Sequence, residues 1–259
     1  MSRPIALITG AASGIGRGIA IHLGGRGYRV CVADLDGDRA AQVAAEIDAL
    51  APPAAGERAI AMPMDVASDA SVGAAIASLA EPVSLLVNNA GLQQVAALQD
   101  LPTGRFAQLV DIMLNGAART TAAALPRMRR AGSGRIINMG SIHSLVASPF
   151  KSAYVAAKHG LVGLTRTTAL ENADLEITVN MICPAYVLTP LVEQQIEAQA
   201  RAHALSRDQV ISEIMLKPMP KRRFIEMDEI CAAVDYLASS GARNITGQCI
   251  VIDGGWTAQ

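Results

Sequence analysis

The sequence is poor in cysteine, and its few cysteines are widely separated. None of the four forms a CxxC pair: they are Cys31, Cys183, Cys231 and Cys249. Structural zinc sites and small disulfide frameworks need paired or closely spaced cysteines. We therefore expect no metal site and a reducing environment. No cleavable hydrophobic segment follows Met1, which adds the expectation of a cytoplasmic protein.

Long hydrophobic runs and an excess of one charge are also missing. No apolar run approaches the ~20 residues that span a bilayer. The 22 Lys and Arg side chains nearly balance the 23 Asp and Glu side chains, so no overall field attracts nucleic acid or an anionic membrane. The basic run at residues 221–223 has no aromatic side chains among its charges, unlike sites for single-stranded nucleic acid. These absences favour a small-molecule substrate, with no nucleic-acid and no membrane partner.

The sequence does contain a regular alternation of short β-branched segments and longer amphipathic or alanine-rich segments. This alternation is typical of a parallel sheet covered by helices. Strands are predicted at residues 5–9, 29–33, 60–63, 84–88, 135–139, 177–182 and 248–252, and helices beginning near Ile15, Gly37, Asp69, Leu101, Ser152 and Met227. We therefore expect an α/β Rossmann fold with a doubly wound, seven-stranded parallel sheet, in a single domain over residues 1–259.

Residues 189–225 interrupt this alternation. Thr189-Pro190 opens a polar, alanine-rich helical stretch, and Pro218 and Pro220 follow it. Long excursions inside a compact domain are usually lids or binding elements, so we interpret this segment as a helical substrate lid. A contact between subunits is the alternative.

A glycine-rich segment follows the first predicted strand and opens the first predicted helix. Residues 9–16 read TGAASGIG. Small residues let the backbone approach a pyrophosphate at the positive end of a helix. Glycines also serve close strand-to-helix packing without any ligand. The placement favours a dinucleotide site, with Gly10, Ser13, Gly14, Ile15 and Gly16 as its candidate residues.

The cofactor is predicted from Asp34, at the end of the second strand. Its carboxylate can accept hydrogen bonds from the adenosine ribose and would repel a 2′-phosphate, which favours NAD over NADP. The alternative is a turn or cap residue ahead of Gly37. Other candidate cofactor contacts follow the third and fourth strands: Asp65, Val66, Asn89, Ala90 and Gly91.

Tyr154 and Lys158 are the candidate acid–base pair. They are four residues apart in a predicted helix, so their side chains share one face. A free tyrosine is a poor proton donor and acceptor at neutral pH, but a nearby ammonium stabilises the phenolate. Tyrosinate would take the proton of an alcohol while a hydride leaves carbon, and the phenol would return it during reduction. The alternative is an ordinary exposed pair on a surface helix.

Two further polar residues support the interpretation of Tyr154 and Lys158 as a catalytic pair. Ser141 follows the fifth strand on the same sheet edge and can hydrogen-bond the reacting oxygen. Asn115 can interrupt a helix and hold a water that links Lys158 to solvent, or can simply end a helix.

Together these motifs resemble the classical short-chain dehydrogenase/reductases over essentially the whole chain. The motifs are TGAASGIG, Asn88-Asn89-Ala90-Gly91, Asn115, Ser141, Tyr154-x-x-x-Lys158 and the late Ile252-Asp253-Gly254-Gly255. The resemblance implies a Rossmann fold, a Ser-Tyr-Lys-Asn tetrad and a homotetramer. It also implies nicotinamide contacts from Pro184, Val187 and Thr189, with Ala185 where the family usually has glycine.

A narrower resemblance points to family members that act on small 3-oxo and 3-hydroxy acids. It rests on LQQ at 92–94, SIHSLVASPFKSAY at 141–154, TPLVEQQI at 189–196 and the ending DGGWTAQ. The resemblance implies carboxylate-binding residues at Gln93, His143, Lys151 and Gln195. A carboxylate needs hydrogen-bond donors and preferably a positive charge, which Lys151 can supply. Taken singly, His143 could be a packed loop histidine and Gln195 a solvated helix residue.

The reaction implied is reversible oxidation of (R)-3-hydroxybutyrate to acetoacetate with NAD, the R configuration resting on the resemblance alone. Alternatives are another small acid, such as 3-hydroxyvalerate or 4-oxopentanoate, since one methylene changes binding by only about 1 to 3 kcal/mol. A non-catalytic dinucleotide sensor is the remote alternative, and it would not need Ser141, Tyr154 and Lys158 together. Trp256, the only tryptophan, is interpreted either as a cover of the substrate pocket, possibly in a neighbouring subunit, or as a docked C-terminal residue.

Overall fold

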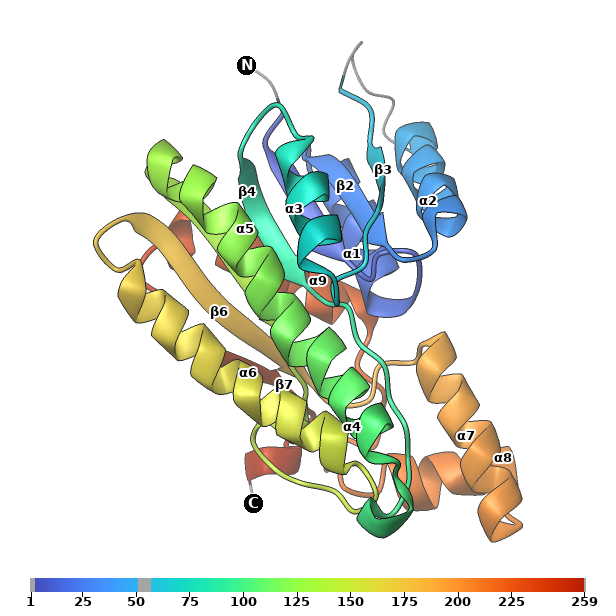
Figure 1. The fold of residues 1–259 in the computed structure, drawn as a ribbon. Coiled ribbons are helices and arrows are strands. Elements are labelled where there is room, and N and C mark those ends of the chain that lie inside the picture. Colours follow the sequence, from blue (N-terminus) through green and yellow to red (C-terminus); the bar gives the residue numbers. More distant parts are fainter. Residues whose placement is uncertain (1–2, 51–56, 259) are drawn as a thin grey trace.

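The computed structural model describes residues 3–50 and 57–258, and one parallel sheet organises them (Figure 1). The spatial order of its seven strands is β3-β2-β1-β4-β5-β6-β7. The strands are β1 (Ile5–Thr9), β2 (Arg29–Asp34), β3 (Ile60–Pro63), β4 (Val83–Asn88), β5 (Ser133–Met139), β6 (Glu176–Pro184) and β7 (Cys249–Ile252). The predicted doubly wound, seven-stranded parallel sheet is confirmed. The order reverses between β1 and β4, and a ligand crevice is expected at that point, outside the strand carboxyl ends.

Helices cover both faces of the sheet because both faces are apolar. On one face, Ile19 and Leu23 of α1 (Gly14–Gly25) pack with residues of α2 (Gly37–Leu50) and α9 (Met227–Ala238). On the other face, Val72 of α3 (Asp69–Ala77) and Met128 of α5 (Gly116–Ala131) pack together. The twenty-residue α6 (Ser152–Glu171) lies beside α5 and contributes Ala169 to this face. Burying a large apolar side chain contributes roughly 1.5–3 kcal/mol, so these two layers hold the sheet in place.

The helical region between β4 and β5 differs from the sequence prediction. One helix was expected to begin near Leu101, and α5 was not predicted at all. The structure has α4 (Thr103–Val110), a π-helical segment (Asp111–Asn115) and then α5, in direct succession. The interruption expected at Asn115 is therefore a π-helical turn within a longer helical run, and not a helix end.

Residues 189–225 form a helical insertion, as the sequence indicated. It contains α7 (Pro190–His203), the short α8 (Arg207–Gln209) and a π-helical segment (Val210–Met215). The Thr189 hydroxyl caps α7 by accepting a hydrogen bond from the Val192 amide. At its base a parallel bridge pairs Val187 with Ile225. The insertion packs its own apolar side chains together, including Val192, Ile196, Val210 and Met215.

Within residues 3–50 and 57–258, no helix combines the length and the apolar character that crossing a membrane would require.

Candidate active site

A cavity of about 340 Å³ lies at the carboxyl ends of the central strands, where the sheet order reverses. Most of the predicted cofactor residues line it: Gly10, Ser13, Gly14, Ile15, Asp34, Asp65, Val66, Asn89, Ala90, Gly91, Tyr154, Lys158 and Thr189. Residues that the sequence predicted from six separate segments thus share one cleft. Gly16 lies beneath the glycine turn, and Pro184 and Val187 line the adjoining substrate pocket instead.

The glycine turn has its shape because two of its positions cannot carry a side chain. Gly10 has φ +63°, and a Cβ there would lie 2.8 Å from Ala90 Cα. A Cβ on Gly16 would lie 2.3 Å from the Gly10 carbonyl oxygen. Asn89 fixes the turn, because its Nδ2 donates to the carbonyl oxygens of Thr9 and Gly10 at 3.0 and 3.1 Å. The N-terminus of α1 is thereby left free to face an anionic group in the cleft.

The Asp34 carboxylate is held at the rim of this cleft by backbone donors. Its Oδ2 accepts from the Ala12 amide at 2.9 Å, and its Oδ1 accepts from the Asp36 amide at 3.1 Å. Asp65 Oδ1 accepts from the Ala67 amide at 2.9 Å and lines the same cleft. A glycine turn at a helix N-terminus, with a fixed carboxylate at the end of the next strand, fits the pyrophosphate and ribose of a nicotinamide dinucleotide.

Tyr154 and Lys158 face the cleft from the first turns of α6. Lys158 Nζ lies 5.6 Å from the centre of the Tyr154 ring and donates to the Met139 carbonyl oxygen at 2.5 Å. The lysine side chain is buried, and burial lowers its pKa to about 8. Its ammonium form therefore prevails at neutral pH and is lost above about pH 8.

The Tyr154 phenol lies close to Ser141. Burial raises the pKa of Tyr154, while the hydrogen bond with the Ser141 side chain acts in the opposite direction. Ser141 itself is buried, and its hydroxyl accepts from the His143 amide at 3.2 Å. The phenol is thus protonated at neutral pH in this structure and is placed to donate its proton beside the serine hydroxyl.

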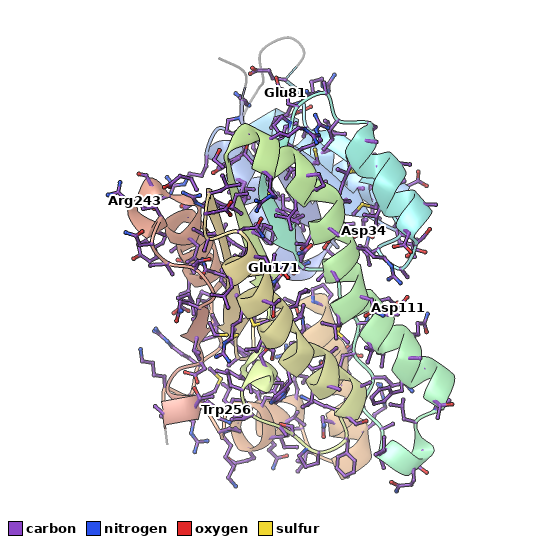
Figure 2. The ribbon with its side chains drawn as sticks, turned by 60° about the vertical axis from the view of Figure 1, so that its left-hand side comes forward. Asp34, Glu81, Asp111, Glu171, Arg243 and Trp256 are labelled. Carbon is purple, nitrogen blue, oxygen red and sulfur yellow. The ribbon has the colours of Figure 1, made fainter. Side chains whose placement is uncertain are left out.

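The side chain of Asn115 does not line the cavity that Tyr154 and Lys158 face. Its side chain is exposed, and its Nδ2 donates to Asp111 Oδ1 at 2.9 Å, on the outer side of the helical run where Figure 2 labels Asp111. The residue of the π-helical segment that turns inward is Met113, which is buried and packs with Tyr154 and Ala157. The helix is interrupted at Asn115 as expected, and the water that would link Lys158 to solvent through this residue stays a prediction.

A second cavity, of about 100 Å³, lies beside Tyr154 and contains all the predicted substrate residues: Gln93, Ser141, His143, Lys151, Tyr154, Gln195 and Trp256. They come from the segments after β4 and β5, the start of α6, the helical insertion and the end of the chain. In Figure 2, Trp256 lies well apart from Asp34, at the other end of the two adjoining cavities. Trp256 lines the pocket of its own chain. The distance between ring centres is 6.1 Å from Trp256 to His143 and 5.9 Å from Trp256 to Tyr186.

The charge of this pocket comes from Lys151. Its Nζ lies 3.4 Å from His143 Nε2, and no ion pair among the described residues involves it. Burial, then the neighbouring Lys151, lowers the pKa of His143 to about 4, so the imidazole is neutral at pH 7. Lys151 is half-buried, and buried charges in proteins are usually paired with an opposite charge. An anionic ligand in the pocket could supply that opposite charge.

The two glutamines meet across the pocket. Gln195 Nε2 on α7 donates to Gln93 Oε1 at 2.7 Å. Gln93 Nε2 is buried and has no protein partner among the described residues. An amide donor of this kind is costly to bury unless a ligand satisfies it.

Sequence reasoning missed Tyr186, which lines the pocket beside Lys151. Lys151 Nζ lies 3.4 Å from the Tyr186 hydroxyl and 5.4 Å from the centre of its ring. The only signal in the sequence was its place two residues after Pro184, inside a segment assigned to the cofactor.

Comparisons with known proteins agree with this geometry. The family model for short chain dehydrogenases matches residues 4–200. The chain is 43% identical over 258 residues to a D-beta-hydroxybutyrate dehydrogenase of Rhizobium meliloti and 42% identical over 257 residues to one of Cupriavidus necator, with 98% of each chain covered in both cases. A solved structure of actinorhodin polyketide ketoreductase with NADPH is 32% identical, covers both chains fully and superposes with a TM-score of 0.92.

Proposed function

Because the chain belongs to the short-chain dehydrogenase family, we propose that it is an NAD-dependent dehydrogenase that interconverts (R)-3-hydroxybutyrate and acetoacetate. One observation carries the proposal: the Lys151 ammonium, which has no ion-pair partner among the described residues, shares a small cavity with Tyr154 and Ser141. The two relatives named D-beta-hydroxybutyrate dehydrogenase support the same substrate.

The pocket suits a short acid with an oxygen on its third carbon. Lys151 and the free Gln93 Nε2 supply donors for a carboxylate. Tyr154 and Ser141 supply hydrogen bonds to the reacting oxygen. Trp256 adds an apolar surface. Both ends of such an acid thus find matching groups within one cavity.

The protein's own residues transfer the hydroxyl proton of the substrate. When bound, NAD supplies the acceptor for the hydride that leaves the alcohol carbon. The Tyr154 oxygen takes the hydroxyl proton during oxidation and returns it to the ketone oxygen during reduction. The Ser141 hydroxyl orients the reacting oxygen, and the ammonium of Lys158 favours the phenolate while oxidation proceeds.

NAD is proposed over NADP because of Asp34. A fixed carboxylate at the end of β2 suits ribose hydroxyls and repels a phosphate at the same position. The ketoreductase neighbour is described with NADPH, so cofactor preference needs its own measurement.

The test follows NADH formation by the purified protein with NAD and, separately, (R)-3-hydroxybutyrate, (S)-3-hydroxybutyrate, 3-hydroxyvalerate and uncharged 2-butanol. We expect strong activity with the R hydroxybutyrate and far less with the S form and with 2-butanol. Preference for 3-hydroxyvalerate would keep the acid pocket and change the substrate. A preference for 2-butanol would overturn the proposed carboxylate site.

A further inference from the structure

Among the residues that the structure describes, two neutral groups and no acid contact the Lys151 ammonium. Its Nζ lies 3.4 Å from both His143 Nε2 and the Tyr186 hydroxyl. It also lies 5.4 Å from the centre of the Tyr186 ring, within the range of a cation–π contact. Each of these groups favours the charged ammonium without cancelling its charge. A carboxylate in the same place would form an ion pair and remove the attraction for a substrate anion.

Burial destabilises the ammonium form of Lys151, so the neutral groups around it must supply compensating hydrogen bonds. Burial lowers the pKa of Lys151, and the imidazole beside it is already neutral at pH 7. The phenol oxygen is a hydrogen-bond acceptor for the ammonium, and burial raises the pKa of Tyr186, so the phenol stays uncharged. The Tyr186 oxygen is therefore placed to accept a hydrogen bond from Lys151 Nζ and to orient the ammonium.

Both the backbone and the ring of Tyr186 are held in place. The Tyr186 backbone carbonyl accepts a hydrogen bond from the Ile225 amide at 2.9 Å, beside the bridge that closes the base of the helical insertion. The ring lies 5.9 Å from Trp256 at an interplanar angle of 38°. It packs with apolar residues of both the main core and the insertion. A side chain held in this way can impose a position on the more flexible lysine.

We propose that Tyr186 is a positioning residue for Lys151, and that its hydroxyl directs the lysine ammonium at the substrate carboxylate and thereby determines the preference for acids over uncharged ketones. This inference rests on the proposed function, because it assigns Tyr186 to the acid end of the same pocket.

Tyr186→Phe tests this role, since it removes the hydroxyl and retains the ring. We expect kcat/KM for acetoacetate, relative to kcat/KM for uncharged butanone, to fall about threefold to tenfold, the size of one hydrogen bond. The loss should come mainly from a higher KM for the acid. Tyr236→Phe is the matched control, because Tyr236 is exposed on α9.

A double-mutant cycle separates positioning from packing. In a Lys151→Met background, Tyr186→Phe should change the acid-to-ketone ratio by less than about twofold, because the group that it positions is gone. The inference is overturned if Tyr186→Phe leaves the acid-to-ketone ratio of the otherwise unchanged enzyme as it was. It is also overturned if the effect of Tyr186→Phe is equally large without Lys151.

Failure of the proposed substrate can be told apart from failure of this inference. If neither acetoacetate nor another short keto acid is turned over, acetate binding to the NAD-loaded protein is measured by calorimetry. Weaker acetate binding by Tyr186→Phe than by wild type and Tyr236→Phe would support the role of Tyr186 at an anion site. Equal acetate binding by all three proteins, or none by the wild type, would overturn it.

Discussion

Gln195 Nε2 donates to Gln93 Oε1 at 2.7 Å, which joins the helical insertion to the segment after β4. The two residues are 102 positions apart in the sequence, and both line the substrate pocket. This contact is the polar link between the insertion and the opposite wall. It uses the acceptor oxygen of Gln93 and leaves the Gln93 Nε2 donor to a ligand.

Replacement of Gln195 by alanine should weaken acid binding. The change removes a donor and leaves Gln93 without its partner, at a cost of about 1 kcal/mol or more. We expect KM for acetoacetate to rise about fivefold, measured in steady-state assays. Gln194→Ala, at the neighbouring exposed position on α7, is the control. Equal effects of the two variants would contradict a specific role for the glutamine contact.

Replacement of Tyr154 by phenylalanine should remove hydride transfer while preserving the fold. The variant lacks the only hydroxyl proposed to exchange a proton with the substrate, so the rate should fall on the order of 100-fold or more. Stopped-flow absorbance measures the rate, and NADH fluorescence measures binding of the cofactor. Undiminished turnover in a variant that binds NADH normally would refute the tyrosine mechanism.

Asp34→Ala should narrow the preference for NAD. Removal of the carboxylate takes away a like charge near the 2′ position, worth ~1 kcal/mol or more, so the NADP-to-NAD ratio of kcat/KM should rise about tenfold. Asp38→Asn is the control, because Asp38 is exposed in the first turn of α2. If wild type uses both cofactors equally, the assignment of Asp34 is wrong.

The two reaction directions should respond oppositely to pH. Reduction needs the protonated phenol of Tyr154, whose pKa is raised by burial, and the ammonium of Lys151, whose pKa is lowered by burial. Lys158, with its pKa near 8, loses above that pH the charge that favours the phenolate, which limits the gain in oxidation. Acetoacetate reduction should therefore decline as the pH rises and Lys151 loses its charge, whereas oxidation should gain from loss of the Tyr154 proton.

Profiles of kcat/KM against pH in both directions check this expectation. Butanone serves as the control, because its reduction does not need the Lys151 charge and should decline at a higher pH than acetoacetate reduction. Coincident profiles for the two ketones would show that Lys151 does not contribute.

The central strands of the sheet could be predicted from sequence because they contain runs of buried apolar residues. β1, Ile5–Thr9, is buried at every position. α5 could not be predicted, because Pro126 lies inside it and Thr120 and Thr121 lie on its buried face. Those threonines are tolerated through tertiary contacts: Asn88 Nδ2 donates to the Thr121 hydroxyl at 3.0 Å. Packing against the sheet overrides the weak local preference for a helix.

Site residues could be predicted from sequence where regular secondary structure determines their relative positions. They could not be predicted where an irregular backbone or a long-range contact determines them. Tyr154 and Lys158 meet because a regular helix places residues four apart on one face. The exposed side chain of Asn115 could not be predicted, because residue spacing does not reveal the π-helical segment in which it lies. Tyr186 was missed because its contact with Lys151 joins segments 35 residues apart.

The bridge between Val187 and Ile225 makes the helical insertion a modular part of the protein. Its two ends meet at one point, and much of its apolar surface is satisfied internally. Changes in length or sequence between those ends need not disturb the register of the seven strands. Substrate range can therefore diversify during evolution, or be redesigned by exchanging this segment, while the proton-transfer residues on α6 stay where they are.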